Sequence, residues 1–279
     1  MAFLEKVLTA SRRNTSLICI GLDPEYERLP PHLLTQHDPI LAFQHALIEA
    51  TADLVCAYKP NLAFYEALGP AGLVTLQETL RLIPPHIPVI GDAKRGDMSN
   101  TARQYARALF EVYQFDAITV HPYLGQDSLQ PFFDYHDKGV LVLCRTSNLG
   151  ARDLQDLSVS DGQAGQERLF EYIARQVVNW NSAGNAGLVV GATYPAELQR
   201  IRQIAPELPI LIPGIGAQGG ELQAAVSAGV DAFGERAIIS ASRSVLYASS
   251  GPDFAEAAAQ VTRSLRDQAN QARRAAESP

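Results

Sequence analysis

The chain has 279 residues, of which 47% are hydrophobic and 19% charged, so it can bury a large core and is not a disordered polyelectrolyte. Its formal net charge of -7 argues against general binding to nucleic acid or to anionic membranes, although one local basic pocket could still bind an anionic small molecule. The sequence has no apolar run of the roughly 20 residues that cross a bilayer, and its N-terminus lacks the residue order of a secretory signal.

Three cysteines, Cys19, Cys56 and Cys144, each lie in an apolar run that predicts a strand. Their odd number and wide spacing fit neither a disulfide framework nor a zinc site. We therefore expect buried free thiols and a reducing, cytoplasmic location.

Short apolar runs alternate with longer amphipathic stretches along the whole chain. The runs predicted as strands are 16–22, 55–59, 88–94, 117–121, 139–146, 186–192, 209–214 and a part of 231–240. A helix is predicted after Asp38, with Asp38 as its N-cap and Pro39 at the first helical position. Further helical stretches include 163–183, 195–204, 221–228 and 253–275.

Eight strand–helix units in a chain of this length predict one α/β domain, a single (β/α)8 TIM barrel over residues 1–279. The strands are apolar throughout rather than alternating, as expected of parallel strands covered on both faces. A doubly wound open sheet is the alternative. The polar segment 148–165 is either a mobile loop or an ordinary surface excursion, and about ten residues at the C-terminus are expected to fray.

The strongest chemical signal is the block Asp92-Ala-Lys94-Arg-Gly-Asp97 at the end of the third predicted strand. Asp92 and Lys94 are two residues apart, so they share one face of a strand, at the end of a barrel where catalytic groups are found. Lys59 ends the second predicted strand at the same end. With Asp97, these residues would form a row of alternating charge in which each group keeps its neighbours ionised. A lysine in such a row can protonate a developing carbanion, whereas a purely structural ion pair is the alternative.

A second signal follows the seventh and eighth predicted strands. The glycine-rich segment 213–220 and the segment 241–244, which contains Arg243, stand where TIM barrels commonly bind phosphate. Ordinary glycine turns are one alternative. Another is a dinucleotide site, because residues 214–219 match Gly-x-Gly-x-x-Gly and Glu235 follows at about the required 20 residues. Six strand–helix units precede this motif, however, and leave little chain for a dinucleotide domain.

Together these blocks resemble the orotidine 5'-phosphate decarboxylase family, in its longer bacterial (type 2) branch. The matching segments are 20–24, 58–69, 92–97 with Thr101, 119–125, 146–148, 213–220 and 242–248. The resemblance implies decarboxylation of orotidine 5'-monophosphate to uridine 5'-monophosphate, the last step of de novo UMP synthesis, with no metal and no cofactor. It also implies that the protein binds a small-molecule substrate, orotidine 5'-phosphate, and forms a homodimer. No nucleic acid or membrane is expected as a partner.

The resemblance assigns catalytic roles to four charged residues. Lys94 would protonate C6 of the pyrimidine, Asp92 would lie against the leaving carboxylate, and Lys59 would link this network to the ribose. Asp97, with Thr101 beside it, would reach into the active site of the partner subunit.

Substrate contacts are implied by the same resemblance. Asp23 would bind a ribose hydroxyl, and Ser147 would contact the edge of the pyrimidine. Gln218 and Arg243 would hold the 5'-phosphate. His121, which stands where asparagine is frequent in the family, is expected to be a positioning or structural residue.

Two further functions are weighed. Mg²⁺-dependent sugar-phosphate lyases and decarboxylases of the same barrel superfamily share an Asp-x-Lys-x-x-Asp core, but the Arg-Gly pair within 92–97 and the Lys-Pro-Asn block at 59–61 favour the nucleotide substrate. A non-catalytic binder of phosphorylated ligands is the other, and the intact set of charged residues argues against it. Arg95 alternates away from Lys94 and is expected outside the pocket, paired with an acid.

Overall fold

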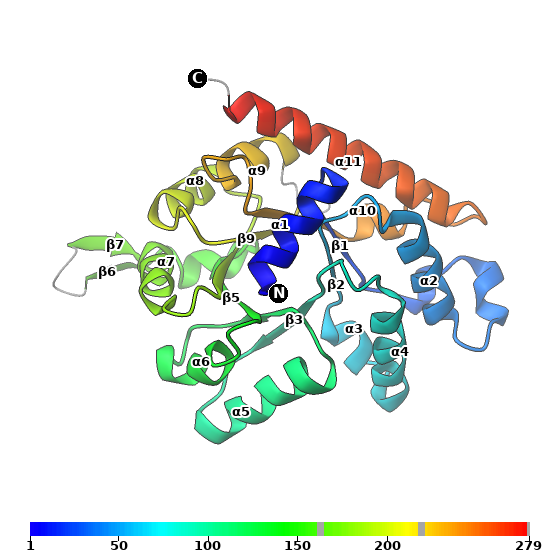
Figure 1. Ribbon diagram of the computed structural model, residues 1–279, viewed down its shortest axis with the longest axis horizontal. Coiled ribbons are helices and arrows are strands. Elements are labelled where there is room, and N and C mark those ends of the chain that lie inside the picture. Colours follow the sequence, from blue (N-terminus) through cyan, green and yellow to red (C-terminus); the bar gives the residue numbers. More distant parts are fainter. Residues whose placement is uncertain (161–164, 217–220, 278–279) are drawn as a thin grey trace.

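The computed structural model describes residues 1–160, 165–216 and 221–277 and contains one eight-stranded parallel sheet with a ring of helices around it (Figure 1). Neighbouring strands follow the order β2-β1-β10-β9-β8-β5-β4-β3. Parallel bridges from Tyr58 to Val89 and from Asn61 to Asp92 join the two outermost strands of this order and close the sheet. The fold is therefore the predicted (β/α)8 TIM barrel and not an open, doubly wound sheet.

The elements of the barrel agree with the predicted ones to within a few residues, except that the expected helix 163–183 begins only at Leu169. The strands are β1 (Ile18–Gly21), β2 (Ala57–Lys59), β3 (Ile90–Arg95), β4 (Ala117–Val120), β5 (Gly139–Arg145), β8 (Ala186–Val190), β9 (Ile210–Pro213) and β10 (Ala237–Ala241). The helices are α1 (Phe3–Asn14), α2 (Pro39–Thr51), α3 (Leu62–Glu66), α4 (Gly69–Leu82), α5 (Ser99–Arg107), α6 (Gln126–Phe133), α7 (Leu169–Trp180), α8 (Pro195–Ile204), α9 (Leu222–Gly229), α10 (Arg243–Leu246) and α11 (Phe254–Glu277). Short helical turns are η1 (Tyr26–Arg28), η2 (Pro31–Thr35), η3 (Ala108–Val112) and η4 (Leu149–Asp153).

Strand β5 shows how apolar runs build two cores. Val140 and Val142 pack in the layer between strands and helices, whereas Leu141 and Leu143 pack inside the barrel. Both faces of the strand are thus covered, which is why the sequence shows no polar alternation. Each fully buried aliphatic side chain of this kind stabilises the fold by about 1.5–3 kcal/mol.

Helix α1 closes the N-terminal end of the barrel, and Figure 1 shows it lying across the ring of strands. Phe3 and Val7 belong to the same interior cluster as Cys19 and Cys56. Cys19, Cys56 and Cys144 are free and buried, as predicted, and burial raises the pKa of the Cys19 thiol to about 12. These cysteines therefore pack as small apolar side chains.

Helix α2 begins where the sequence predicts. The Asp38 carboxylate accepts a hydrogen bond from the Leu41 N–H at 2.9 Å, and Pro39 occupies the first helical position. The second Asp38 oxygen accepts a hydrogen bond from Thr75 Oγ1 of α4 at 2.7 Å. One carboxylate thus caps α2 and ties it to the neighbouring helix.

Two segments add detail to the prediction. Within 148–165 the described residues form η4 and strand β6 (Ser158–Ser160), which pairs antiparallel with β7 (Gln166–Arg168). Helix α11 ends at Glu277, two residues beyond the predicted helix 253–275. Within it Ala269 and Ala272 are buried, and Asn270 Nδ2 donates a hydrogen bond to the Thr15 carbonyl at 2.8 Å, so tertiary packing holds this part of the helix. No helix among the described residues is long and apolar enough to cross a membrane.

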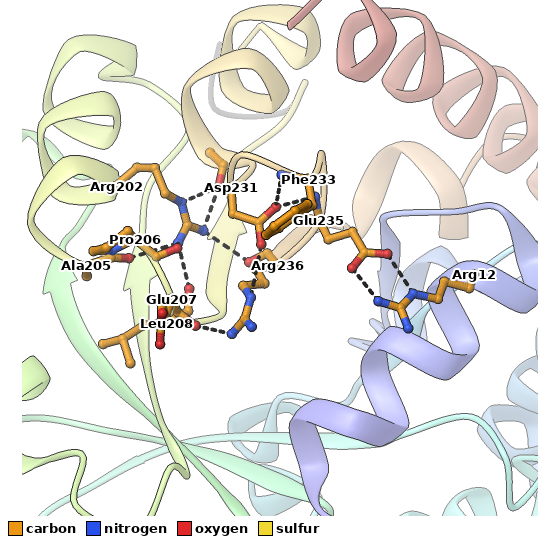
Figure 2. A network of polar contacts seen from close by, with 11 residues as sticks. Arg12, Arg202, Ala205, Pro206, Glu207, Leu208, Asp231, Phe233, Glu235 and Arg236 are labelled. Carbon is orange, nitrogen blue, oxygen red and sulfur yellow. Dashed lines mark hydrogen bonds and ion pairs between the residues drawn. The ribbon is translucent and has the colours of Figure 1, made fainter. Parts of the chain in front are cut away.

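A buried arginine joins backbone segments at the N-terminal end of the barrel by hydrogen bonds (Figure 2). Arg202 of α8 donates hydrogen bonds to the carbonyls of Gly229 at 2.7 and 2.9 Å, Ala205 at 2.9 Å and Leu208 at 2.7 Å. Burial lowers the pKa of Arg202 to about 10, so it remains protonated at neutral pH. This end of a TIM barrel serves stability rather than catalysis.

Figure 2 also locates Glu235, the acid on which a dinucleotide site would depend. Its carboxylate forms two hydrogen bonds of 2.7 Å with Arg12 of α1, just before β10 begins. Glu235 therefore lies at the N-terminal end of the barrel, whereas Gly214 and Gly216 of the motif follow β9 at the C-terminal end. The dinucleotide interpretation is wrong for this reason.

Candidate active site

A cavity of about 460 Å³ opens at the C-terminal ends of the strands. Its floor includes Leu143, Val189 and Leu211 from the barrel interior. Its wall contains most of the site residues predicted from the sequence: Asp23, Lys59, Asp92, Lys94, Ser147 and Arg243. The cavity thus joins an apolar base to a charged rim.

Three charged side chains form a row across one side of the cavity, which we call the lysine–aspartate row: Lys59, Asp92 and Lys94. Lys59 Nζ lies 3.3 Å from one Asp92 oxygen, and Lys94 Nζ lies 2.6 Å from the other. The side chains of Lys59 and Asp92 are 5% and 12% exposed, whereas that of Lys94 is 50% exposed. Lys94 is therefore the cation of the row that faces the open cavity.

The backbone of Lys94 is held in an unusual conformation, with φ at 47°. The pairing of β3 with β4 is irregular between Gly91 and Arg95, so the two charged side chains meet across a local distortion rather than along a regular strand. Thr119 of β4 supports both: its Oγ1 accepts a hydrogen bond from the Lys94 N–H at 3.0 Å and donates one to Asp92 at 2.8 Å. Such strain in a non-glycine residue is characteristic of functional sites.

In the lysine–aspartate row, burial and neighbouring charges shift the pKa values in opposite directions. Burial alone would raise the pKa of Asp92, but Lys59, Lys94 and the hydrogen bonds to the carboxylate hold that pKa well below its usual range. Burial alone would lower the pKa of Lys59, but the carboxylates of Asp23 and Asp92 raise it above its usual value. Both groups are consequently charged at neutral pH.

Asp23 links three strand ends at the other side of the rim. One of its oxygens accepts a hydrogen bond from the Asn61 N–H at 3.0 Å, and the other accepts one from Ser242 Oγ at 2.8 Å. Because Asp23 follows β1, Asn61 follows β2 and Ser242 follows β10, these contacts fix the carboxylate relative to Lys59.

The remaining predicted substrate contacts lie on two other loops. Ser147 follows β5 and packs closely against Gly191, where an added Cβ would lie 2.9 Å from the Ser147 Cβ. Arg243 is the first residue of α10 and lines the cavity. Gln218, the other predicted phosphate contact, lies outside the described residues.

Asp97 and Thr101 do not line the cavity of their own chain among the residues that the structure describes. The Asp97 carboxylate accepts a hydrogen bond from the Met98 N–H at 2.7 Å, and Thr101 is exposed on α5. The row of four charges expected within one chain is thus a row of three, because the backbone turns away from the cavity after Lys94.

Two residues near the lysine–aspartate row, Arg95 and His121, contact other parts of the protein. Arg95 pairs with Glu66 and lies over the ring of Tyr105 at 5.4 Å, outside the cavity as expected. The ring of His121 packs against Gly96, where an added Cβ would lie 2.5 Å from His121 Nε2. His121 therefore supports the backbone that leads to Asp97.

Sequence reasoning gave no role to four polar residues of the site: Asn61, Thr119, Arg145 and Ser242. Three of them stand in blocks that resemble the family, and Arg145 directly precedes such a block. That position is the signal by which they could have been found. Their contacts, however, join segments that are distant in sequence.

Comparisons with known proteins agree with this geometry. The model of the orotidine 5'-phosphate decarboxylase / HUMPS family matches residues 16–260. The chain is 53% identical to the orotidine 5'-phosphate decarboxylase of Thermomicrobium roseum, over 96% of this chain and 94% of that protein. It is 52% identical to that of Cellvibrio japonicus, over 98% of this chain and 100% of the other.

Solved structures give the same result. A putative orotidine-monophosphate decarboxylase from Toxoplasma gondii superposes with a TM-score of 0.89 at 34% identity, over 100% of this chain and 99% of that one. The orotidine monophosphate decarboxylase of Leishmania donovani superposes with a TM-score of 0.81 at 41% identity, over 96% and 100%. The chain therefore belongs to the orotidine 5'-phosphate decarboxylase family.

Proposed function

We propose that this chain converts orotidine 5'-monophosphate to uridine 5'-monophosphate and carbon dioxide, using its own charged side chains and no cofactor. The observation that carries the proposal is Lys94, a half-exposed cation held 2.6 Å from Asp92 in the cavity wall. Loss of carbon dioxide from C6 leaves an electron pair in an sp² orbital that the ring delocalises poorly. Charges fixed before the reaction are a direct means of stabilising that pair.

The reaction proceeds at the lysine–aspartate row. The bond between C6 and the carboxylate breaks, and its electron pair stays on C6 beside the Lys94 ammonium group. Lys94 Nζ then gives a proton to C6 and later regains one from solvent. Asp92 lies against the leaving carboxylate and directs Lys94, while Lys59 keeps Asp92 ionised and reaches the ribose.

Substrate binding uses the rest of the rim. Asp23 binds a ribose hydroxyl, Ser147 contacts the pyrimidine edge, and Arg243 with Gln218 holds the phosphate. The phosphate lies far from C6, so the free energy of binding it can order the site for reaction. Arg243 is suited to this role because a guanidinium can form two parallel hydrogen bonds with a phosphate.

The active form is a homodimer in which Asp97 and Thr101 complete the partner's site. Support comes from their position after β3, outside their own cavity. Large apolar side chains are exposed beyond the C-terminal ends of β3, β4 and β5, among them Met98 at 66%, Tyr123 at 80% and Leu149 at 84%. Burial of exposed apolar side chains in a subunit interface at this end would fit the proposed dimer. The free, buried cysteines fit a cytoplasmic location.

Turnover of orotidine 5'-monophosphate, followed by the absorbance of the pyrimidine in the presence of EDTA, tests the proposal. Conversion to uridine 5'-monophosphate with EDTA present is the expected result. A folded protein that converts nothing, or converts substrate only after Mg²⁺ is restored, would contradict it. In that case Mg²⁺-dependent sugar-phosphate chemistry would be tested next.

A further inference from the structure

We infer that Arg145 is a positioning residue for the reaction, because it fixes the cavity wall at residues 146–148 to the segment that leads into the β6–β7 hairpin. The inference rests on the proposed function, since it concerns the wall that contains Ser147.

Arg145 is buried at an unexpected place for a charged residue. It is the last residue of β5, its side chain is 1% exposed, and it lines the cavity. Leu143, two residues earlier, lines the same cavity, and the pairing of β5 with β8 is irregular between Leu143 and Arg145. A buried cation is costly unless it is paired and hydrogen-bonded, so its contacts indicate what it does.

The guanidinium group of Arg145 contacts three different segments. Its Nη1 donates a hydrogen bond to the Thr146 carbonyl at 2.9 Å. Its Nε lies 3.3 Å from a carboxylate oxygen of Asp156, beyond η4. Its plane lies over the ring of Tyr194, in the turn between β8 and α8, at 4.4 Å from the ring centre. A planar group with several donors is needed for such a set of contacts.

Gln155, next to Asp156, contacts the same part of the wall and accepts a hydrogen bond from Arg145 Nη1 at 3.4 Å. Its Oε1 accepts a hydrogen bond from the Thr146 N–H at 2.8 Å, and its Nε2 donates one to Thr146 Oγ1 at 2.9 Å. Thr146 Oγ1 in turn contacts Asn148 Oδ1 at 2.6 Å. Thr146 is thus held at its N–H, its carbonyl and its hydroxyl.

Ser147 has little freedom between these fixed neighbours. Thr146 and Asn148 are joined on either side of it, and Gly191 packs against its Cβ. The Gly191 N–H also donates a hydrogen bond to the Arg145 carbonyl at 2.7 Å, which anchors this contact to β5. The placement of Ser147 in the cavity therefore depends on Arg145 and its partners.

A comparison with Arg202 separates positioning from stability. Arg202 is also buried, but its donors bind backbone carbonyls at the opposite end of the barrel. In contrast, Arg145 Nη1 donates hydrogen bonds to the Thr146 carbonyl at 2.9 Å and to Gln155 Oε1 at 3.4 Å, and Arg145 Nη2 donates one to Asp156 at 3.5 Å. Arg145 therefore acts on the cavity wall, whereas the contacts of Arg202 lie at the end of the barrel remote from the cavity.

The test compares Arg145→Met with Arg202→Met, after wild-type turnover has established the reaction. Misplacement of the wall should lower kcat/KM of Arg145→Met by about 10- to 100-fold, because small displacements at an active site have effects of this size. Arg202→Met should lower Tm but leave kcat/KM per folded molecule within about twofold of wild type, since it is remote from the cavity. Wild type that fails to turn over would refute the proposed function, whereas equal kinetics of the two variants would refute only this inference.

Two additional variants give readouts that a merely structural role would not change. If Arg145 acts through Ser147, kcat/KM of the double variant Arg145→Met/Ser147→Ala should lie within about threefold of kcat/KM of the less active single variant. The reason is that the effects of coupled residues are not additive. Arg145→Lys should remain within about threefold of Arg145→Met, because lysine lacks the planar fork. Full additivity, or full recovery by lysine, would overturn the inference. If Arg145→Met does not fold, Gln155→Ala replaces it with the same expected loss in kcat/KM and the same criteria.

Discussion

At the scale of single residues, the site depends on buried side chains that stay ionised. Burial disfavours their charged forms, and neighbouring opposite charges stabilise them. Asp92 is ionised because Lys59 and Lys94 flank it, and Lys59 is protonated because Asp23 and Asp92 flank it. The result is a fixed field around the exposed Lys94 ammonium group before substrate arrives. Pre-organised charge of this kind is worth more in a partly buried cavity than in water.

The pKa shifts predict how stability responds to pH. The pKa of Asp92 is lowered by folding, so its contribution is present above the unfolded-state value of about 3.9 and is lost as pH falls further. The pKa of Lys59 is raised, so its contribution is present below about 10.4 and is lost as pH rises through the folded-state value. The difference in Tm between wild type and Asp92→Asn should therefore be flat from about pH 5 to 9 and shrink below about pH 4. A marked change in that difference between about pH 6 and 8 would show that other groups control the row.

At the scale of elements, helix caps and loop ends fix where each strand delivers its side chains. Asp38 is the clearest case, because its carboxylate caps α2 and also accepts a hydrogen bond from Thr75 of α4. Both contacts lie on the outer helical layer, away from the lysine–aspartate row. They contribute to folding without contacting the reaction site.

Asp38→Ala should lower the free energy of unfolding by about 2 kcal/mol, about half from the lost cap and half from the lost hydrogen bond. Urea denaturation would measure it, with Asp38→Asn as the control that retains a capping oxygen. We expect kcat to be unchanged in both variants. Equal stability of Asp38→Ala and wild type would show that the cap is replaced by solvent.

Apolar periodicity and cap signals predicted the barrel because they are local. Strands covered on both faces need continuous apolar runs, and Asp38-Pro39 is a helix start in any fold. The sequence predicted most of the charged residues of the cavity, because charged side chains at the C-terminal ends of barrel strands indicate an active site. Thr119 and Arg145 were not predicted, because their contacts arise only when β3 meets β4 and when the segment after η4 folds back on β5.

At the scale of the whole molecule, the two ends of the barrel have separate tasks. The N-terminal end is closed by α1 and fastened by Arg202 and by the pair of Arg12 with Glu235 (Figure 2). The C-terminal end contains the cavity and, after β3, residues that point away from it. This division lets loops at one end change without weakening the other.

Subunit complementation tests the proposed exchange of Asp97 between subunits. Lys94→Ala and Asp97→Ala are each expected to be inactive as homodimers. A mixed dimer, co-expressed with two different tags and purified through both, contains one site with both native residues and should show about half of the wild-type kcat per dimer. Failure of the mixed dimer to regain activity would mean that Asp97 acts in its own subunit, and an active Asp97→Ala homodimer would mean that the reaction does not need Asp97.

The most direct measurement is single-turnover conversion of bound orotidine 5'-monophosphate by wild type and by Lys94→Ala, with binding of uridine 5'-monophosphate as the control for an intact site. If Lys94 both stabilises the C6 electron pair and protonates it, as proposed, its loss should slow the chemical step by at least about 10⁴-fold while product binding changes by less than about tenfold. A Lys94→Ala variant that binds product normally and still decarboxylates near the wild-type rate would contradict the role of Lys94 as proton donor.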